Sequence, residues 1–191
     1  MSSAYSPVPE LNLLKELEDS LDGEAFSDGF ELFEYGRVSP LGPEPPAELR
    51  DRLIPFAQAT ASGSFYALWK RDDEVDLATL PVIFCGDEGD LFIAARDLRE
   101  LFRLLAVEDE DGDECAPARQ AYVGWLKRTF GLTPAEDPGA IYRAALAEYG
   151  RAFADWWLTF DDEDSIVADL LEELEELEEL EELEELEELG R

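Results

Sequence analysis

Four short apolar segments between residues 53 and 94 constrain the fold of this chain more than any other feature. They are Leu53–Ala57, Phe65–Trp69, Leu80–Cys85 and Leu91–Ala94. Each has the length of a strand, and the turn-forming residues Ser62–Ser64 and Gly86–Gly89 lie between them. Because such short connections join antiparallel neighbours, we expect these segments to pair as hairpins.

A further strand is indicated upstream of these segments. Residues 30–35 mix apolar and acidic side chains in the manner of a half-buried strand. Pro55 has no backbone N–H group, so it favours an edge strand or the first residue of a strand. The sequence therefore predicts a central, mostly antiparallel sheet of about four to six strands.

Helical patterns lie on both sides of these strands along the chain. Asp97 and Glu100 have the spacing of a capping box, and Asp137-Pro138 joins a capping side chain to a favoured first helical residue. The expected fold class is α+β with helices flanking the sheet, and the prolines within residues 1–9 predict a loose N-terminal arm. The predicted helices cover residues 10–22, 47–52, 98–106, 117–130 and 138–160.

The chain ends in a Leu-Glu-Glu repeat from Leu171 to Leu189. A three-residue step turns a helix by about 300°, so successive leucines wind around the helix instead of forming the seam of a coiled coil. Glutamates three and four residues apart repel each other, and no lysine separates them. After a folded domain over residues 10–165, we expect a tail over 166–191 that is helical or partly disordered, packed near Leu170–Leu177 and projecting beyond.

The chain is strongly acidic throughout. It carries 48 acidic and 15 basic residues, for a formal net charge of −33 at pH 7. The last 21 residues hold twelve glutamates and one arginine, so they contribute −11 and most of the charge lies elsewhere. Such a surface repels phosphate backbones and anionic membranes and attracts basic partners. We therefore expect a protein partner, and neither a nucleic acid nor a membrane.

The residue types that most enzymes depend on are scarce. The chain has no histidine, which excludes serine–histidine and cysteine–histidine catalysis. Cys85 and Cys115 are too few for a zinc site, and Cys85 is expected to act as a small hydrophobic residue in a strand. The first residues have no basic segment followed by an apolar stretch, so we expect no secretory signal, and no apolar run is long enough to span a membrane. We predict a cytoplasmic protein that is not an enzyme and that uses no cofactor or metal.

Three acidic clusters are the candidate partner-binding sites. The middle cluster is similar to a calcium-binding loop around Gly112, but Val107 stands where the first ligand is required, so a solvated loop fits better. For each cluster, a binding interface and a surface that only keeps the protein soluble are equally good explanations. The candidate residues are Asp87, Glu88 and Asp90, then Asp109, Asp111 and Asp113, and finally Asp161, Asp162 and Asp164.

The adjacent residues Trp156 and Trp157 cannot both face the same side of a helix. One of them continues a stripe of large apolar residues that begins at Tyr142, and that spacing predicts core packing. The other lies either under the tail or in solvent. Because exposed tryptophan is a common interface anchor, Trp157 is a tenth candidate partner-binding residue.

The order of motifs between Leu53 and Ala106 resembles the SUKH superfamily, the Smi/Knr-type proteins. An (I/V)PFA strand, a glycine-punctuated hairpin, an aromatic strand, a second hairpin and a helix recur there. The matching segments here are Ile54–Ala57, Ser62–Trp69, Leu80–Phe84, Gly86–Gly89 and Leu98–Ala106, and Phe30–Phe33 is similar to the preceding strand. The resemblance covers roughly half the chain. It implies an α+β fold and an immunity protein that neutralises a polymorphic or contact-dependent bacterial toxin, and it transfers no active-site residue.

Two functions therefore stand as hypotheses. In the first, the acidic surface of an immunity protein competes for the basic surface with which a nuclease toxin holds phosphates. In the alternative, the protein is a regulator or scaffold that recruits basic partners through its acidic tail. Deletion of residues 171–191 distinguishes them, because it abolishes the second function and spares the first.

Overall fold

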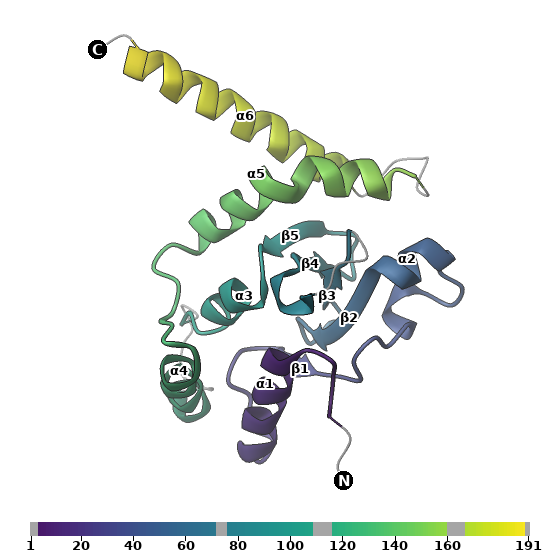
Figure 1. Ribbon diagram of the computed structural model, residues 1–191, viewed down its shortest axis with the longest axis vertical. Helices are drawn as coiled ribbons and strands as arrows, with labels where there is room; N and C mark the ends of the chain where they lie inside the picture. Colours follow the sequence, from purple (N-terminus) through teal and green to yellow (C-terminus); the bar gives the residue numbers. More distant parts are fainter. Residues whose placement is uncertain (1–3, 72–75, 109–115, 160–166, 190–191) are drawn as a thin grey trace.

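The computed structural model describes residues 4–71, 76–108, 116–159 and 167–189. Within them, five strands form one antiparallel sheet in the order β1-β2-β3-β4-β5, with helices on both faces (Figure 1). The predicted α+β fold is confirmed. The strands are β1 (Glu31–Leu32), β2 (Leu53–Gln58), β3 (Phe65–Trp69), β4 (Val82–Cys85) and β5 (Leu91–Ala95). The helices are α1 (Pro9–Ser20), α2 (Ala47–Arg52), α3 (Leu98–Leu104), α4 (Ala116–Phe130), α5 (Pro138–Trp157) and α6 (Ala168–Leu189).

The sheet separates two hydrophobic cores, one on each face. In β3, Phe65, Ala67 and Trp69 belong to the core shared with α5 and the start of α6. Tyr66 and Leu68 point to the opposite core, which joins the sheet to α1, α3 and α4. Because successive side chains of a strand alternate between faces, a strand covered on both sides must be apolar throughout. This explains why the segment 65–69 contains no charged residue.

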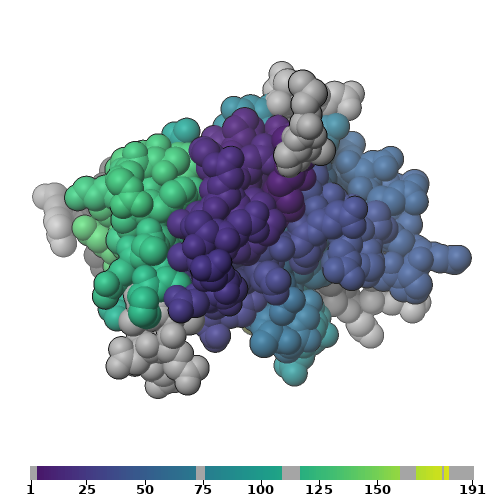
Figure 2. Space-filling model, turned by 90° about the horizontal axis from the view of Figure 1, so that it is seen from below, coloured from purple at the N-terminus to yellow at the C-terminus, as the bar shows by residue number. Residues whose placement is uncertain are grey.

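Helix α1 and the loop after it close the second core. Leu11 and Leu14 of α1 are fully buried against the sheet. In Figure 2, α1 crosses the middle of this face, between α4 and the segment that follows β1. Phe26 then stacks on Tyr122 of α4, with ring centroids 4.3 Å apart. The loop after α1 thus joins α4 to the rest of the domain.

The prediction of a loose arm over residues 1–9 is wrong for its second half. The hydroxyl group of Tyr5 donates a hydrogen bond to the carbonyl of Phe56 in β2, at 3.1 Å. Val8 has no exposed surface, and Pro9 is already the first residue of α1. The two prolines therefore fix the approach to the helix instead of keeping the arm free, because proline is favoured in the first helical turn.

Pro55 lies in an interior strand, and not at an edge or a strand start as predicted. Its carbonyl accepts a hydrogen bond from the N–H group of Gly36 at 2.8 Å, on the side of β2 that faces β1. The N and O atoms of one strand residue point to the same side, so the missing N–H group faces away from β3. The ladder between β2 and β3 therefore loses no bond at Pro55, and a register shift follows before Ala57.

The strand predicted over residues 30–35 is present but shorter, as Glu31–Leu32. Phe33 and Gly36 still donate their N–H groups to carbonyls of β2, at 3.2 and 2.8 Å. The chain therefore stays bound to the sheet after it has left regular strand geometry.

The predicted helix caps are largely confirmed. Asp137 Oδ1 accepts the N–H of Ala140 at 3.1 Å, and Asp97 Oδ1 accepts the N–H of Glu100 at 2.8 Å. The carboxylate of Glu100 does not return to Asp97, as a capping box requires, but accepts the N–H of Arg96 at 3.0 Å. The guanidinium group of Arg96 also binds this carboxylate, which explains the shift by one residue.

The acidic tail is helical, as α6, and it packs where the sequence predicted. Val167, Leu170 and Leu174 are buried in the core shared with α5, and Leu177 is partly buried against it. Leu180 is 57% exposed, which agrees with a helix that projects beyond its contact. The expected domain end at residue 165 is too early, because the buried leucines extend the packed unit to Leu174.

Candidate functional site

The acidic hairpin between β4 and β5 is the best-defined candidate site. The N–H group of Gly86 donates to the carbonyl of Asp90 at 2.7 Å and closes the turn. Gly89 has a φ of +101°, a conformation that other residues rarely adopt. The side chains of Asp87, Glu88 and Asp90 are all exposed at this turn. The glycines thus place three carboxylates within four residues of chain.

Asp87 is not a free carboxylate, because it binds the loop between β2 and β3. Its Oδ1 accepts hydrogen bonds from the hydroxyl groups of Ser64, at 2.6 Å, and of Ser62, at 3.0 Å. Ser64 is buried, and its Oγ in turn accepts the N–H of Asp87 at 3.3 Å. The bonds from Ser64 and then Ser62 lower the pKa of Asp87 below its usual value. Asp87 therefore stays ionised and ties two loops together at one end of the sheet.

Glu88 and Asp90 differ from Asp87 in their surroundings. Within the part of the chain that the structure describes, neither side chain has a hydrogen bond or an ion pair. Their carboxylates therefore face solvent from a turn that Asp87 and the two serines hold in place. An arrangement of this kind can receive a lysine or arginine side chain of a partner, since the backbone that carries the two charges is already fixed before binding.

Nothing in the sequence marks the two serines as functional residues. The pattern predicts Ser62 and Ser64 only as residues of a turn, and that turn is confirmed. Their bond to Asp87 depends on the pairing of β3 with β4, which brings Phe65 opposite Cys85. The sequence carries no local signal for it, because the partners are 23 residues apart.

Trp157 is half-buried, so it is not an exposed anchor beside the acidic hairpin. Trp156 takes the buried position of the stripe, and Trp157 packs against it and against Phe153, with ring centroids 6.1 and 5.8 Å apart. This cluster contacts Trp69 at the end of β3 that is remote from the hairpin. Four strand residues, on the order of 13 Å, separate the two places, so the structure does not bring Trp157 to the acidic hairpin.

The other six candidate residues fall outside the described part of the chain. They are Asp109, Asp111, Asp113, Asp161, Asp162 and Asp164. Of the three predicted acidic clusters, the hairpin is the one that lies within the described residues.

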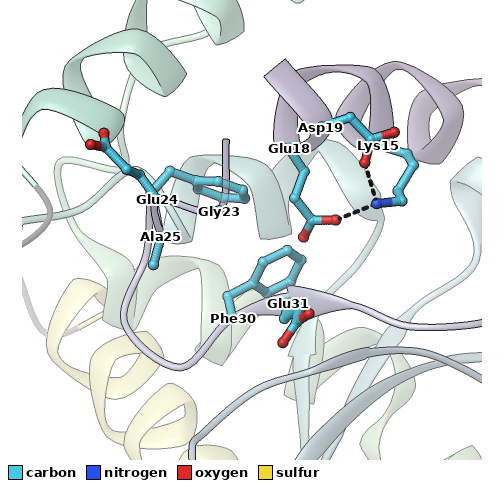
Figure 3. A pocket seen from close by; sticks show the side chains of 9 residues that line it. Lys15, Glu18, Asp19, Gly23, Glu24, Ala25, Phe30 and Glu31 are labelled. Atoms are coloured by element: carbon cyan, nitrogen blue, oxygen red, sulfur yellow. Dashed lines mark hydrogen bonds and ion pairs between the residues drawn. The ribbon is translucent and has the colours of Figure 1, made fainter. Parts of the chain in front are cut away.

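A hollow of about 380 Å³ lies between the end of α1 and β1 (Figure 3). In it, the carboxylate of Glu18 points toward the ring of Phe30, and Lys15 reaches it from the same helix. Lys15 Nζ lies 3.0 Å from Glu18 Oε2 and 2.6 Å from Asp19 Oδ1. Glu18 Oε1 accepts the N–H of Leu32 at 2.8 Å. Both oxygens of Glu18 are thus engaged within the protein: Oε1 joins α1 to β1, and Oε2 pairs with Lys15 of the same helix.

Three further features bear on chemistry. Cys85 is buried in the core as predicted, and burial raises the pKa of its thiol, so the thiolate is disfavoured. Among the described residues, no group of three or more aspartate, glutamate or cysteine side chains is placed to hold a metal ion. No helix in the described ranges has the length and apolar character needed to cross a membrane.

No family model, curated protein or solved structure matches this chain. The likeness to the SUKH superfamily therefore stays a prediction from the sequence motifs.

Proposed function

We propose that this protein is a non-catalytic, cytoplasmic binding protein that captures a basic protein partner. The role that fits best is that of an immunity protein, which neutralises a bacterial polymorphic or contact-dependent toxin. The observation that carries the proposal is the acidic hairpin, where Glu88 and Asp90 have no partner among the described residues and Asp87 fixes the turn.

Charge supports this role in two ways. A net charge of −33 attracts a cationic protein over distances longer than a contact, although salt screens this attraction. At contact, two solvent-facing carboxylates on a fixed turn give the partner's basic side chains a defined place to bind. The SUKH-like order of motifs from Leu53 to Ala106 points to the same role, because members of that superfamily bind toxins.

The proposal is tested by binding to the protein encoded in the neighbouring open reading frame, at low and at high salt. Reversing both free charges, with Glu88→Lys and Asp90→Lys, is expected to weaken binding by about tenfold or more, mainly through a slower association rate. The control is Glu16→Lys with Glu44→Lys, which makes the same change of charge at two exposed residues. These also have no hydrogen bond or ion pair within the described residues. Equal losses in the two double variants would show that only total charge matters and would remove the hairpin from the proposal.

A second candidate function is a scaffold that recruits basic partners through α6. It is favoured by the exposure of Leu180 and of the carboxylates of Glu172, Glu175, Glu176 and Glu179. Because Leu174 is part of the core, a cut at residue 171 would also disturb the fold. Deleting residues 178–191 keeps the packed turns and removes the projecting ones. Loss of partner binding in this variant supports the scaffold, and retained binding supports the hairpin.

A further inference from the structure

Helix α6 is attached to α5 through its first turns. Val167, Leu170 and Leu174 are 0%, 1% and 3% exposed, whereas Leu180 is 57% exposed. The apolar contact therefore ends near Leu177, which is half-buried. The remaining turns of α6 extend away from α5 in Figure 1.

The place that receives α6 is formed by the absence of a side chain at Gly150. A Cβ atom there would lie 2.8 Å from Leu174 Cδ2 and 2.9 Å from Leu146 Cδ1. Such distances are shorter than van der Waals contact, so Leu174 can lie this close to α5 because residue 150 has no side chain. This close approach makes Leu174 the residue that fixes α6 in position.

Electrostatic repulsion within α6 opposes the helical conformation that presents its leucines to α5. No basic residue occurs in Ala168–Leu189, and glutamates three and four residues apart repel each other along the helix. Glu173 lies at the contact itself, where its carboxylate accepts a hydrogen bond from the hydroxyl group of Tyr142 on α5. The charged group that faces it from α6 is Glu176. Partial burial and then the charge of Glu176 raise the pKa of Glu173, so the docked helix disfavours the ionised form.

We propose that α6 is a strap over α5, in which residues 168–177 dock on α5 when the strap is closed. The charge on the glutamates of α6 controls this closure. Neutralising these carboxylates removes the repulsion along the helix and leaves the leucine contact at Gly150 unopposed, so the strap closes. At full charge it opens from its outer end. A cationic partner that binds the exposed turns has the same effect as protons, and this second half of the inference rests on the proposed function.

The first test is amide hydrogen exchange of the full chain at pH 7.5 and 5.0, corrected for the intrinsic pH dependence of exchange. Residues 168–177 are expected to exchange several-fold more slowly at pH 5.0. Glu173→Gln should give part of this slowing already at pH 7.5, because it removes the charge and keeps an acceptor for Tyr142. The control Glu16→Gln changes the net charge equally on α1 and should leave α6 unchanged. The proposal is overturned if the corrected exchange rates of residues 168–177 are the same at both pH values. It is also overturned if they are the same in Glu173→Gln as in the unchanged protein.

The second test adds polylysine at pH 7.5 as a cationic probe. Slower exchange in residues 168–177 supports coupling between binding and closure. Binding of polylysine without any slowing overturns the coupling. The pH experiment does not depend on a partner, so failure of the hairpin to bind a basic protein would leave its result standing.

Discussion

Ser64 and Asp87, 23 residues apart in the chain, are bound to each other in both directions. The hydroxyl group of Ser64 donates to Asp87 Oδ1 at 2.6 Å, and the same oxygen accepts the N–H of Asp87 at 3.3 Å. Through this pair, the loop before β3 is joined to the hairpin after β4.

Replacing Ser64 by alanine is expected to lower the free energy of unfolding by about 1 kcal/mol, because Asp87 loses both of its hydrogen bonds to this buried hydroxyl. Urea denaturation of the two proteins measures the difference. Ser62→Ala is the matched control, since Ser62 is exposed and its bond to Asp87 is longer, at 3.0 Å. A loss in Ser62→Ala as large as that in Ser64→Ala would contradict the role given to the buried serine.

The pair also predicts how stability depends on pH. The pKa of Asp87 is lower in the folded protein than its ordinary value of 3.8. Its bonds therefore stabilise the fold fully above pH 3.8, and this contribution is lost as the pH falls through the lowered pKa. We expect NMR titration of the Asp87 carboxyl group to give a pKa below 3.8, and Ser64→Ala to raise it. If the pKa of Asp87 is unchanged in Ser64→Ala, the hydrogen bond from Ser64 does not stabilise the ionised carboxylate.

Two leucines of the tail repeat should respond very differently to the same substitution. Leu174→Ala is expected to cost about 2–4 kcal/mol, because Leu174 is 3% exposed and its removal leaves a cavity against α5. Leu180→Ala should change stability by less than about 0.5 kcal/mol, since Leu180 is 57% exposed. Thermal or urea unfolding monitored by tryptophan fluorescence gives both values. Similar effects at the two positions would mean that α6 does not dock as described.

Gly150 should not tolerate a larger side chain, although it lies within a helix. We expect Gly150→Val to lower the free energy of unfolding by about 1–3 kcal/mol, because its side chain overlaps Leu174 and Leu146. In α4, Gly124→Ala is expected to be stabilising by about 0.5–1 kcal/mol, since only the end of the exposed Arg128 side chain lies within 3 Å. Opposite signs for the two variants are the expected result of the denaturation experiment.

The sequence was informative wherever local patterns decide structure. The apolar segment Phe65–Trp69 is β3, Ala47–Arg52 is α2, and Asp137 caps α5, because length, periodicity and capping chemistry act over a few residues. The winding of leucines in the tail correctly limited its contact to the first turns.

The features that escaped prediction depend on contacts between distant residues. Tyr5 is anchored by a carbonyl 51 residues away, and two prolines nearby gave no sign of it. Glu18 could not be distinguished among 48 acidic residues until the fold placed it beside Leu32. Charge alone makes the hairpin a candidate site in the sequence, but the difference between Asp87 and its two solvent-facing neighbours depends on the register of β3 and β4.

The bond between Glu18 and Leu32 also limits how a partner can bind. β1 is the outermost strand, and its N–H group at Leu32 is already occupied by a side chain of the same molecule. A foreign strand that tried to extend the sheet at this margin would have to displace Glu18 first. Recognition here must therefore work through side chains and charge, and growth of the sheet from one molecule into the next is blocked at that margin.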